Sequence, residues 1–241
     1  MTMKTESSPS KEKLEVKEGI LARAVQILAM FVIMALELFL GAGTIYWVWA
    51  WVFLGISIVL VSINAFFMLR NSPETIAERG KPKELATWDK WIGGAILIIQ
   101  YVIIPIIAGL DFRFGWTGNL AAPWHIFGAL VFTLSMGLTG WAMITNAYFS
   151  TAVRIQTDRG QQVCRTGPYH FVRHPGYVGF ILQAVSVPIL LGSLWALLFA
   201  ILVGALIIIR TVKEDRMLQE ELEGYQEYTR EVRYRLLPGI W

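Results

Sequence analysis

The sequence predicts an all-α, polytopic membrane protein with about six transmembrane helices and a cytosolic C-terminal amphipathic helix. Hydrophobic residues make up 55% of its 241 residues, and charged residues make up only 16%. A typical soluble domain carries about 25% charged residues. The apolar residues are gathered into long stretches, and a helix needs about 20 such residues to cross a bilayer.

Six apolar stretches set the expected spans. They cover approximately residues 20–40, 45–69, 91–110, 124–148, 177–191 and 193–211. The fifth stretch is short, contains Pro188, and meets the sixth at Gly192, so we expect these two to form a tight helical hairpin. The chain then divides into a polar N-terminal tail (1–19), expected to be disordered or loosely helical, a four-helix transmembrane region (20–145) and a C-terminal region (146–241).

Loop charges predict the orientation of these spans. Basic residues gather in the loops 70–90 and 150–173, whereas the turns 41–44 and 191–193 carry no charge. Cytoplasmic loops of membrane proteins are enriched in Lys and Arg. We therefore expect both termini and the two basic loops on the cytoplasmic side.

Composition also excludes several classes of partner. The net charge of +3 is small, and no basic stripe interleaved with aromatic residues suggests nucleic-acid binding. The single Cys164 excludes an intramolecular disulfide and a multi-cysteine metal site. The three histidines do not form a metal-binding pair, so we expect no metal ion.

Polar residues crowd the segment 167–179, which lies between two apolar stretches. It contains two Tyr, two His, one Arg and three Gly. A residue before proline avoids the helical region, and proline suits the first helical position, so a helix is expected to begin at Pro175. Free N–H groups at that start would favour an anionic ligand group, and Gly176 and Gly179 would leave the helix face bare. The alternative is an ordinary helix entry in which Arg173 and His174 reach the lipid headgroups.

A second group of polar residues lies where the sixth stretch ends. Arg210 and Glu214 are four residues apart and share a helix face, with Asp215 beside them. The alternative reading is a surface ion pair of little energetic value. The short hairpin, however, returns this group to the membrane side on which Pro175 begins its helix. Beyond it, residues 213–235 predict an amphipathic helix that is interrupted or turned at Gly224.

These motifs together resemble the isoprenylcysteine carboxyl methyltransferase and phospholipid methyltransferase superfamily. The resemblance rests on Gly-Pro-Tyr-x-x-Val-Arg-His-Pro-x-Tyr-x-Gly, the short hairpin, Glu-Asp-x-x-Leu, and Gly-Tyr-x-x-Tyr-x-x-x-Val. It covers about residues 146–241. Members of that superfamily are integral membrane enzymes that use S-adenosylmethionine (SAM), so the resemblance makes 146–241 the catalytic, SAM-binding region.

The resemblance also implies roles for individual residues. Around the helix start, it implies SAM contacts for Tyr169, Arg173, His174, Pro175, Gly176 and Tyr177. In the preceding stretch, it implies SAM contacts for Gln156, Gln161, Gln162, Val163 and Cys164. It further implies that Glu214 contacts SAM, that Arg210 faces the acceptor, and that Arg210, Glu214 and His174 form the catalytic set. The chain departs from the usual pattern at Asp215, where the family has Glu.

This inventory suits methyl transfer from a sulfonium, in which alignment of donor and acceptor supplies much of the rate. Glu214 could balance the cationic cofactor, and Arg210 could bind an acceptor carboxylate or a lipid phosphate. A carboxylate acceptor needs no general base. A protonated amine would need one, and His174 or Glu214 would be the candidate.

The leading hypothesis is therefore a SAM-dependent methyltransferase that modifies a lipid or lipidated acceptor, as isoprenylcysteine carboxyl methyltransferases do. Phospholipid N-methylation is one alternative. A sterol-reductase-like membrane enzyme that uses NADPH is another, because such reductases also resemble the C-terminal segment. A non-enzymatic membrane scaffold is the third. Within the spans, Glu37 is a functional candidate or a helix–helix contact, and Asn64, Gln100, Asn146 and Gln183 are expected to be polar contacts between helices. Asn146 and Arg154 are also expected to border the active-site mouth, because the family-like region begins there.

Overall fold

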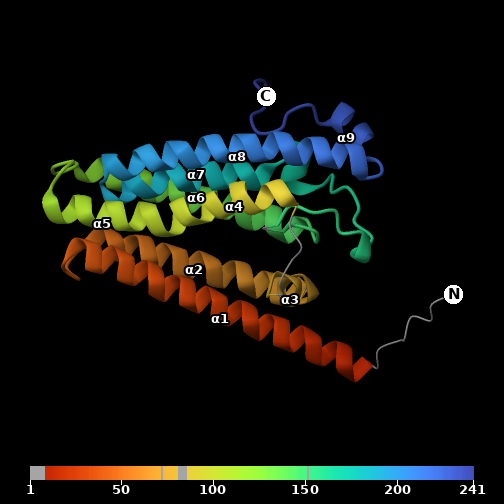
Figure 1. The fold of residues 1–241 in the computed structure, drawn as a ribbon, viewed down its shortest axis with the longest axis horizontal. Helices are drawn as coiled ribbons and strands as arrows, with labels where there is room; N and C mark the ends of the chain where they lie inside the picture. Colours follow the sequence, from red (N-terminus) through yellow and green to blue (C-terminus); the bar gives the residue numbers. More distant parts are fainter. Residues whose placement is uncertain (1–8, 72, 81–85, 151) are drawn as a thin grey trace.

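The computed structural model describes residues 9–71, 73–80, 86–150 and 152–241. In these residues every regular element is a helix. The long helices lie side by side along one axis, and the segment 146–174 and α9 lie together at one end of the bundle (Figure 1). We call this the loop end. The opposite end, where α7 turns into α8, is called the far end.

The helices have the following bounds. They are α1 (Pro9–Ala42), α2 (Val48–Asn71), α3 (Pro73–Gly80), α4 (Thr87–Ile98), the π-helix η1 (Ile99–Ile103), α5 (Ile104–Phe114), α6 (Ala122–Thr145), the 3₁₀ turns η2 (Thr157–Arg159) and η3 (Gly167–His170), α7 (Pro175–Leu191), α8 (Leu194–Glu221) and α9 (Tyr225–Glu231).

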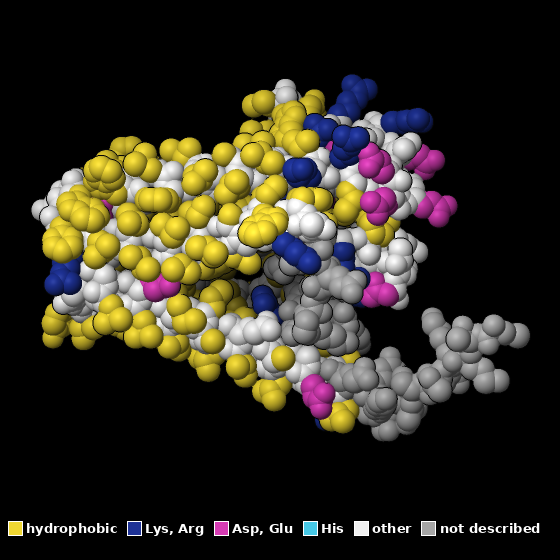
Figure 2. Space-filling view, in the orientation of Figure 1, with side chains coloured by type: hydrophobic (Ala, Val, Ile, Leu, Met, Phe, Trp, Pro, Cys, Tyr) yellow, Lys and Arg dark blue, Asp and Glu magenta, His cyan; other side chains and the backbone are white. Residues whose placement is uncertain are grey.

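Within the described part of the chain, five helices are long and apolar enough to cross a membrane, so the chain is an integral membrane protein. They are Val16–Ala42, Val48–Arg70, Thr87–Phe114, Ala122–Thr145 and Leu194–Glu221. Hydrophobic side chains cover most of the length of the bundle, and charged side chains gather at the loop end (Figure 2). The expected sixth span corresponds to α7, which has only 17 residues and is about 25 Å long. A sixth crossing therefore stays a prediction.

Helix α1 begins before the expected first span. The tail 1–19 was expected to be disordered or loosely helical, but residues from Pro9 onward form one continuous helix to Ala42. Proline suits the first helical position, and the Lys and Glu residues that follow it are good helix formers. Residues 1–8 of the predicted tail lie outside the described residues.

The third span contains a π-helical turn in its middle. Helices α4 and α5 form one segment from Thr87 to Phe114, interrupted by the π-helix Ile99–Ile103 just before Pro105. Proline lacks an N–H group and clashes with the carbonyl of the preceding turn, which disturbs the regular helical bonding there. The extra residue of a π-turn re-aims the side chains beside it, here Gln100 and Tyr101.

The α7–α8 hairpin forms as predicted. Gly192 adopts the left-handed conformation, with φ of 80°, and ends α7. The Ser193 hydroxyl then accepts a hydrogen bond from the Ala196 N–H and caps α8. The same hydroxyl donates to the buried Asp111 carboxylate over 2.5 Å, which ties α5 to the hairpin at the far end.

The charged segment 213–235 does not form a separate amphipathic helix. Its first part continues α8 to Glu221, because nothing between Arg210 and Glu221 breaks the helix. The predicted turn at Gly224 is present: this residue has φ of 77° and directly precedes α9. The chain then returns across the start of α7, where the Arg173 and His174 N–H groups donate to the carbonyl oxygens of Tyr234 and Arg235.

Close packing of α6 against α7 near the far end gives a test of the fold. A Cβ added at Gly128 would lie 2.4 Å from the Leu190 backbone nitrogen, whereas one added at Gly137 would meet nothing within 4 Å. We expect Gly128→Ala to destabilise the protein by about 1–3 kcal/mol, since overpacking forces the helices apart. Thermal unfolding in detergent measures this. Gly137→Ala, on the same helix, is the matched control, and an equal effect of both changes would contradict the packing.

Candidate functional site

A pocket opens at the loop end. The pocket is lined by Asn146, Tyr148, Phe149, Ser150, Ala152, Arg154, Gln156, Gln161, Gln162, Val163, Cys164, Tyr169, Arg173, His174, Gly176, Tyr177, Glu214, Met217, Leu218, Leu222, Tyr225 and Tyr228. Every residue predicted to contact the cofactor is among them except Pro175, which is the buried first residue of α7.

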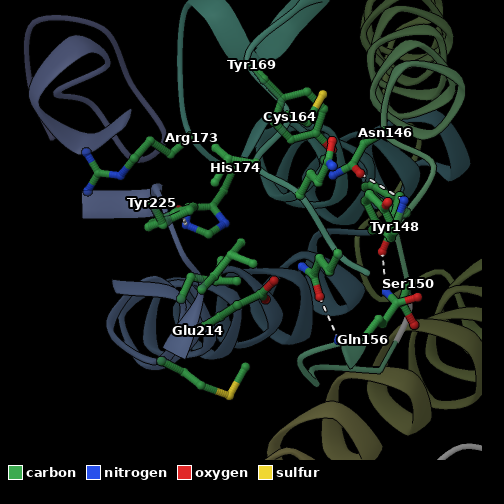
Figure 3. Close-up of a pocket in the computed structure, with 18 of the residues that line it drawn as sticks. Asn146, Tyr148, Ser150, Gln156, Cys164, Tyr169, Arg173, His174, Glu214 and Tyr225 are labelled. Carbon is green, nitrogen blue, oxygen red and sulfur yellow. Dashed lines mark hydrogen bonds between the residues drawn. The ribbon is translucent and has the colours of Figure 1, made fainter. Parts of the chain in front are cut away.

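Three segments far apart in the sequence enclose this loop-end pocket. His174, Tyr225 and Glu214 face one side of the hollow, and Asn146, Tyr148 and Gln156 lie across from them (Figure 3). The first group belongs to the start of α7, the end of α8 and α9, and the second group to the segment between α6 and α7. The site is therefore assembled by the tertiary fold.

Side-chain amides fix the shape of the segment between α6 and α7. The Asn146 Oδ1 atom accepts a hydrogen bond from the Tyr148 N–H over 2.9 Å. The Gln156 Nε2 atom donates to the Tyr148 carbonyl over 2.6 Å, and the Gln161 Oε1 atom accepts from the Gln156 N–H over 2.7 Å. Gln156 and Gln161, which were predicted to contact the cofactor, thus also hold the pocket wall in place.

Asp215 is the centre of a buried ionic network beneath the pocket. It is fully buried, and Arg173 donates to both of its oxygens, over 2.7 and 2.9 Å. Its further partners are His174 Nε2 at 3.1 Å, the Tyr225 hydroxyl at 3.1 Å, Gln219 Nε2 at 2.8 Å and Arg235 Nε at 2.8 Å. The network joins the start of α7 to α8, α9 and the C-terminal segment.

The network changes the expected picture of the α7 start. Free N–H groups were expected there, but the Arg173 and His174 N–H groups donate to the C-terminal segment, and the Tyr177 and Val178 N–H groups donate to the His174 carbonyl. The reason is that the C-terminal residues return to cover this helix start. The Arg173 guanidinium also points toward that segment and donates to the carbonyls of Val232 and Arg233.

Glu214 points into the pocket, unlike its neighbour Asp215. The Tyr177 hydroxyl donates a hydrogen bond to the Glu214 carboxylate. Among the described residues, no Lys, Arg or His side chain lies within salt-bridge distance of Glu214. The pocket therefore contains a half-buried carboxylate whose charge no neighbouring cation balances through a direct ion pair.

Arg210 lies on the other side of Tyr177 and does not line the loop-end pocket. Its guanidinium is 5.5 Å from the centre of the Tyr177 ring. It donates to both oxygens of Asp89, over 2.7 and 2.8 Å, and Asp89 also accepts from the Val153 N–H over 2.9 Å. Sequence reasoning missed Asp89, because it is 121 residues from Arg210 and no local pattern connects them.

Two adjoining cavities within the helix bundle form what we call the membrane hollow. Tyr101, Phe180 and Gln183 line both cavities. Phe149 lines the first of these cavities and the loop-end pocket as well, and Arg210 lines the second. The first cavity lies between α1 and α2 on one side and η1, α6 and α7 on the other, and the second is bounded by α4, η1, α7 and α8.

Polar groups inside the membrane hollow only partly pair with one another. Gln183 joins two helices as expected, because its Nε2 atom donates to the Thr139 hydroxyl over 2.8 Å. By contrast, the buried Asn64 Nδ2 and Gln100 Oε1 atoms have no hydrogen-bond partner among the residues that the structure describes, and neither does the buried Glu37 Oε2 atom outside the hollow. Asn64 and Gln100 were expected to be polar contacts between helices.

Several pocket residues were not predicted from the sequence. Besides Tyr148, they include Met217, Leu218, Tyr225 and Tyr228. Burial, and then the neighbouring Asp215 carboxylate, raises the pKa of Tyr225, so its hydroxyl stays a hydrogen-bond donor. The motif Gly-Tyr-x-x-Tyr could have indicated Tyr225 and Tyr228. Cys164 lines the pocket, and its thiol lies 3.8 Å from the Thr145 carbonyl.

The fold and site define a class: an integral membrane protein with a polar and aromatic pocket at one end of its helix bundle. Residues 128–220 match the model of the isoprenylcysteine carboxyl methyltransferase (ICMT) family. This match assigns residues 128–220 to the isoprenylcysteine carboxyl methyltransferase-like superfamily. The matched region contains α7, most of α8 and most of the residues that line the loop-end pocket.

The curated relatives carry mixed names. A Delta(14)-sterol reductase of Mus musculus is 31% identical over 90 residues, which are 36% of this chain and 22% of the reductase. The protein YpbQ of Bacillus subtilis (strain 168) is 32% identical over 33% of this chain and 48% of its own length. The nickel-cobalt-cadmium resistance protein NccN of Alcaligenes xylosoxydans xylosoxydans is 32% identical over 56% of this chain and 58% of its own length. The chain thus spans less than two thirds of each of these relatives.

The Asp215 network gives a prediction about stability. We expect Asp215→Asn to destabilise the protein by about 3–5 kcal/mol, because the buried Arg173 and the half-buried Arg235 lose their counter-charge. Thermal or denaturant unfolding in detergent measures the change. Glu220→Gln is the matched control on the same helix, since its ion pair with Arg216 is exposed and contributes at most about 1 kcal/mol. Equal stability of the two variants would show that the network is not structural.

Proposed function

We propose that the chain is a SAM-dependent methyltransferase that modifies a lipid or lipidated acceptor in the membrane. The observation that carries this proposal is the Glu214 carboxylate, which faces the loop-end pocket without an ion-pair partner among the described residues. A carboxylate in this position favours a cationic ligand, and SAM carries both an ammonium group and a sulfonium. The family match of residues 128–220 supports the same reaction class.

The residues that line the loop-end pocket fit such a cofactor. Glu214 would hold a cationic group, and the amide side chains of Asn146, Gln161 and Gln162 offer hydrogen bonds to a heteroaromatic base. The apolar side chains of Val163, Met217, Leu218 and Leu222 would pack against the faces of that base. When bound, SAM supplies an electrophilic methyl group on a sulfonium.

The membrane hollow is the proposed acceptor site. It is lined mainly by apolar side chains, and Phe149 separates it from the loop-end pocket. A Cβ at Gly176 would lie 2.4 Å from the Phe149 Cε2 atom, so the absence of a side chain at Gly176 makes room for the Phe149 ring. The π-helical turn directs Gln100 and Tyr101 to the hollow, and such turns are frequent at functional sites. An acceptor would reach the donor past Phe149.

The enzyme's contribution to the reaction is mainly alignment. Methyl transfer is an in-line displacement, so a fixed donor pocket next to a fixed acceptor site supplies much of the rate. His174 is bonded to Asp215, and we assign it a positioning role for the pocket wall. Glu214 is the side chain available to take a proton. Arg210 lines the hollow and belongs to the acceptor side.

We further propose that the loop end, with the active site and both termini, faces the cytoplasm. The basic residues of the loops 70–90 and 150–173 support this orientation under the positive-inside rule. A sixth crossing by α7 is part of the same proposal, because it returns the chain to the loop end before α8.

Ligand binding by the purified protein tests the proposal. We expect calorimetric titration in detergent to show binding of SAM and S-adenosylhomocysteine and no binding of NADPH. Binding of NADPH without SAM would instead support the sterol-reductase-like alternative, which the partial similarity to the Mus musculus reductase keeps open. Binding of neither nucleotide would favour a scaffold.

Substitution of Glu214 tests the site. Because hydrogen bonds to charged groups contribute about 1.5–3 kcal/mol, we expect Glu214→Gln to weaken SAM binding about 10- to 100-fold. Glu220→Gln, an exposed position on the same helix, is the control and should leave the affinity unchanged. Unchanged affinity in Glu214→Gln would place the cofactor elsewhere.

A further inference from the structure

The guanidinium of Arg210, which faces the proposed acceptor site, already binds the carboxylate of Asp89. Arg210 lines the membrane hollow, and its Nε and Nη2 atoms donate to the two oxygens of Asp89. This is the paired geometry in which a guanidinium binds a carboxylate. An acceptor carboxylate would have to take the place of the Asp89 side chain.

Asp89 is held firmly in that place. It is 2% exposed and lies in the first turn of α4, where the helix dipole favours a negative charge. The Val153 N–H donates to the same carboxylate. A Cβ at Gly93, one turn along α4, would lie 3.2 Å from the Asp89 Oδ1 atom, so this glycine leaves room for the pair. Displacing Asp89 would leave a buried charge without its partner, which is strongly unfavourable.

The charges near the reacting position also disfavour an anionic headgroup. Tyr177 separates Arg210 from Glu214, with its ring beneath Arg210 and its hydroxyl on Glu214. Asp89 neutralises Arg210, whereas the Glu214 carboxylate faces the donor pocket. A headgroup that passes Tyr177 toward the donor therefore approaches the Glu214 carboxylate.

We propose that the acceptor is an amphiphile whose headgroup is uncharged and carries an O–H or N–H group, and that Asp89 excludes carboxylate headgroups. This inference rests on the proposed methyltransferase function and deepens it. The apolar tail lies in the membrane hollow. The unpaired Asn64 Nδ2 and Gln100 Oε1 atoms there offer a donor and an acceptor to neutral polar groups of the bound molecule.

The reaction step follows from this headgroup. The acceptor oxygen or nitrogen forms a bond to the methyl carbon, and the bond between that carbon and the donor sulfur breaks, so the sulfonium becomes a neutral thioether. The acceptor's proton passes to the Glu214 carboxylate, which is the proton acceptor that the pocket provides.

Two matched probes test the inference. We suggest meta-pentadecylphenol and meta-pentadecylbenzoate, which have the same alkyl tail. The headgroup of the first is an uncharged hydroxyl, and that of the second is a carboxylate. Radiolabelled SAM reports methyl transfer to each in detergent, and equilibrium binding of each probe is measured in parallel. We expect the wild type to prefer the phenol about tenfold or more, and Asp89→Ala to shift the ratio toward the benzoate by about tenfold or more, because Arg210 becomes available.

Controls make each outcome decisive. Asp111→Asn removes a buried carboxylate at the far end and should leave the headgroup preference unchanged. Asp89→Asn keeps the side-chain shape and replaces Asp89→Ala if that variant does not fold. Equal use and binding of the two probes by the wild type, preference for the benzoate, or an unchanged ratio in the folded Asp89 variants would overturn the inference. If the wild-type protein does not bind SAM, the proposed function itself is rejected instead.

Discussion

The buried Asp215 carboxylate is the constraint on which the candidate site depends. It binds Arg173 and His174 at the start of α7, Tyr225 of α9, and Arg235 in the C-terminal segment. No local sequence preference would bring these segments together. Because burying a carboxylate without partners is prohibitive, all of its partners must be in place for the native fold to be stable. The loop-end pocket is the surface that this network leaves exposed.

Three acidic residues near the pocket have distinct roles that arise from their surroundings. Asp215 and Asp89 are each neutralised by an arginine in paired geometry, and both are buried. Glu214 lies between these ion pairs in space and meets a tyrosine hydroxyl instead of a cation. The two ion pairs fix the backbone on either side of Glu214. The remaining carboxylate is thereby held rigidly while its charge stays directed at the pocket.

Much of the architecture could be predicted from the sequence because it follows from local patterns. Hydropathy gave the long helices, and the short Leu191-Gly192-Ser193 link placed Arg210 and Glu214 at the end of the bundle where Pro175 begins α7. The residues of the segment 156–177 that were predicted to contact the cofactor also line the pocket, except Pro175. These features depend on residues close in sequence or on a single hairpin.

Other features depended on packing between distant segments. Successive residues on a helix point about 100° apart, so one of the pair Glu214 and Asp215 had to face away from the pocket, but only the position of α9 decided which. The partner of Arg210 lies on α4, outside the segment whose motifs indicated a site. The extension of α1 to Pro9 likewise reflects helix-forming residues that a hydropathy reading passes over.

The short length of α7 has a consequence for where in the bilayer the reacting groups would meet. A helix of about 25 Å is shorter than the roughly 30 Å hydrocarbon layer. A mismatch of this kind is accommodated by thinning the bilayer locally or by drawing flanking polar residues inward. In the proposed arrangement in which α7 crosses the membrane, either response sets the Pro175 end of α7, and the pocket above it, at the depth of the lipid headgroups. A lipid could then present its headgroup to the donor while its chains stay dissolved among those of its neighbours.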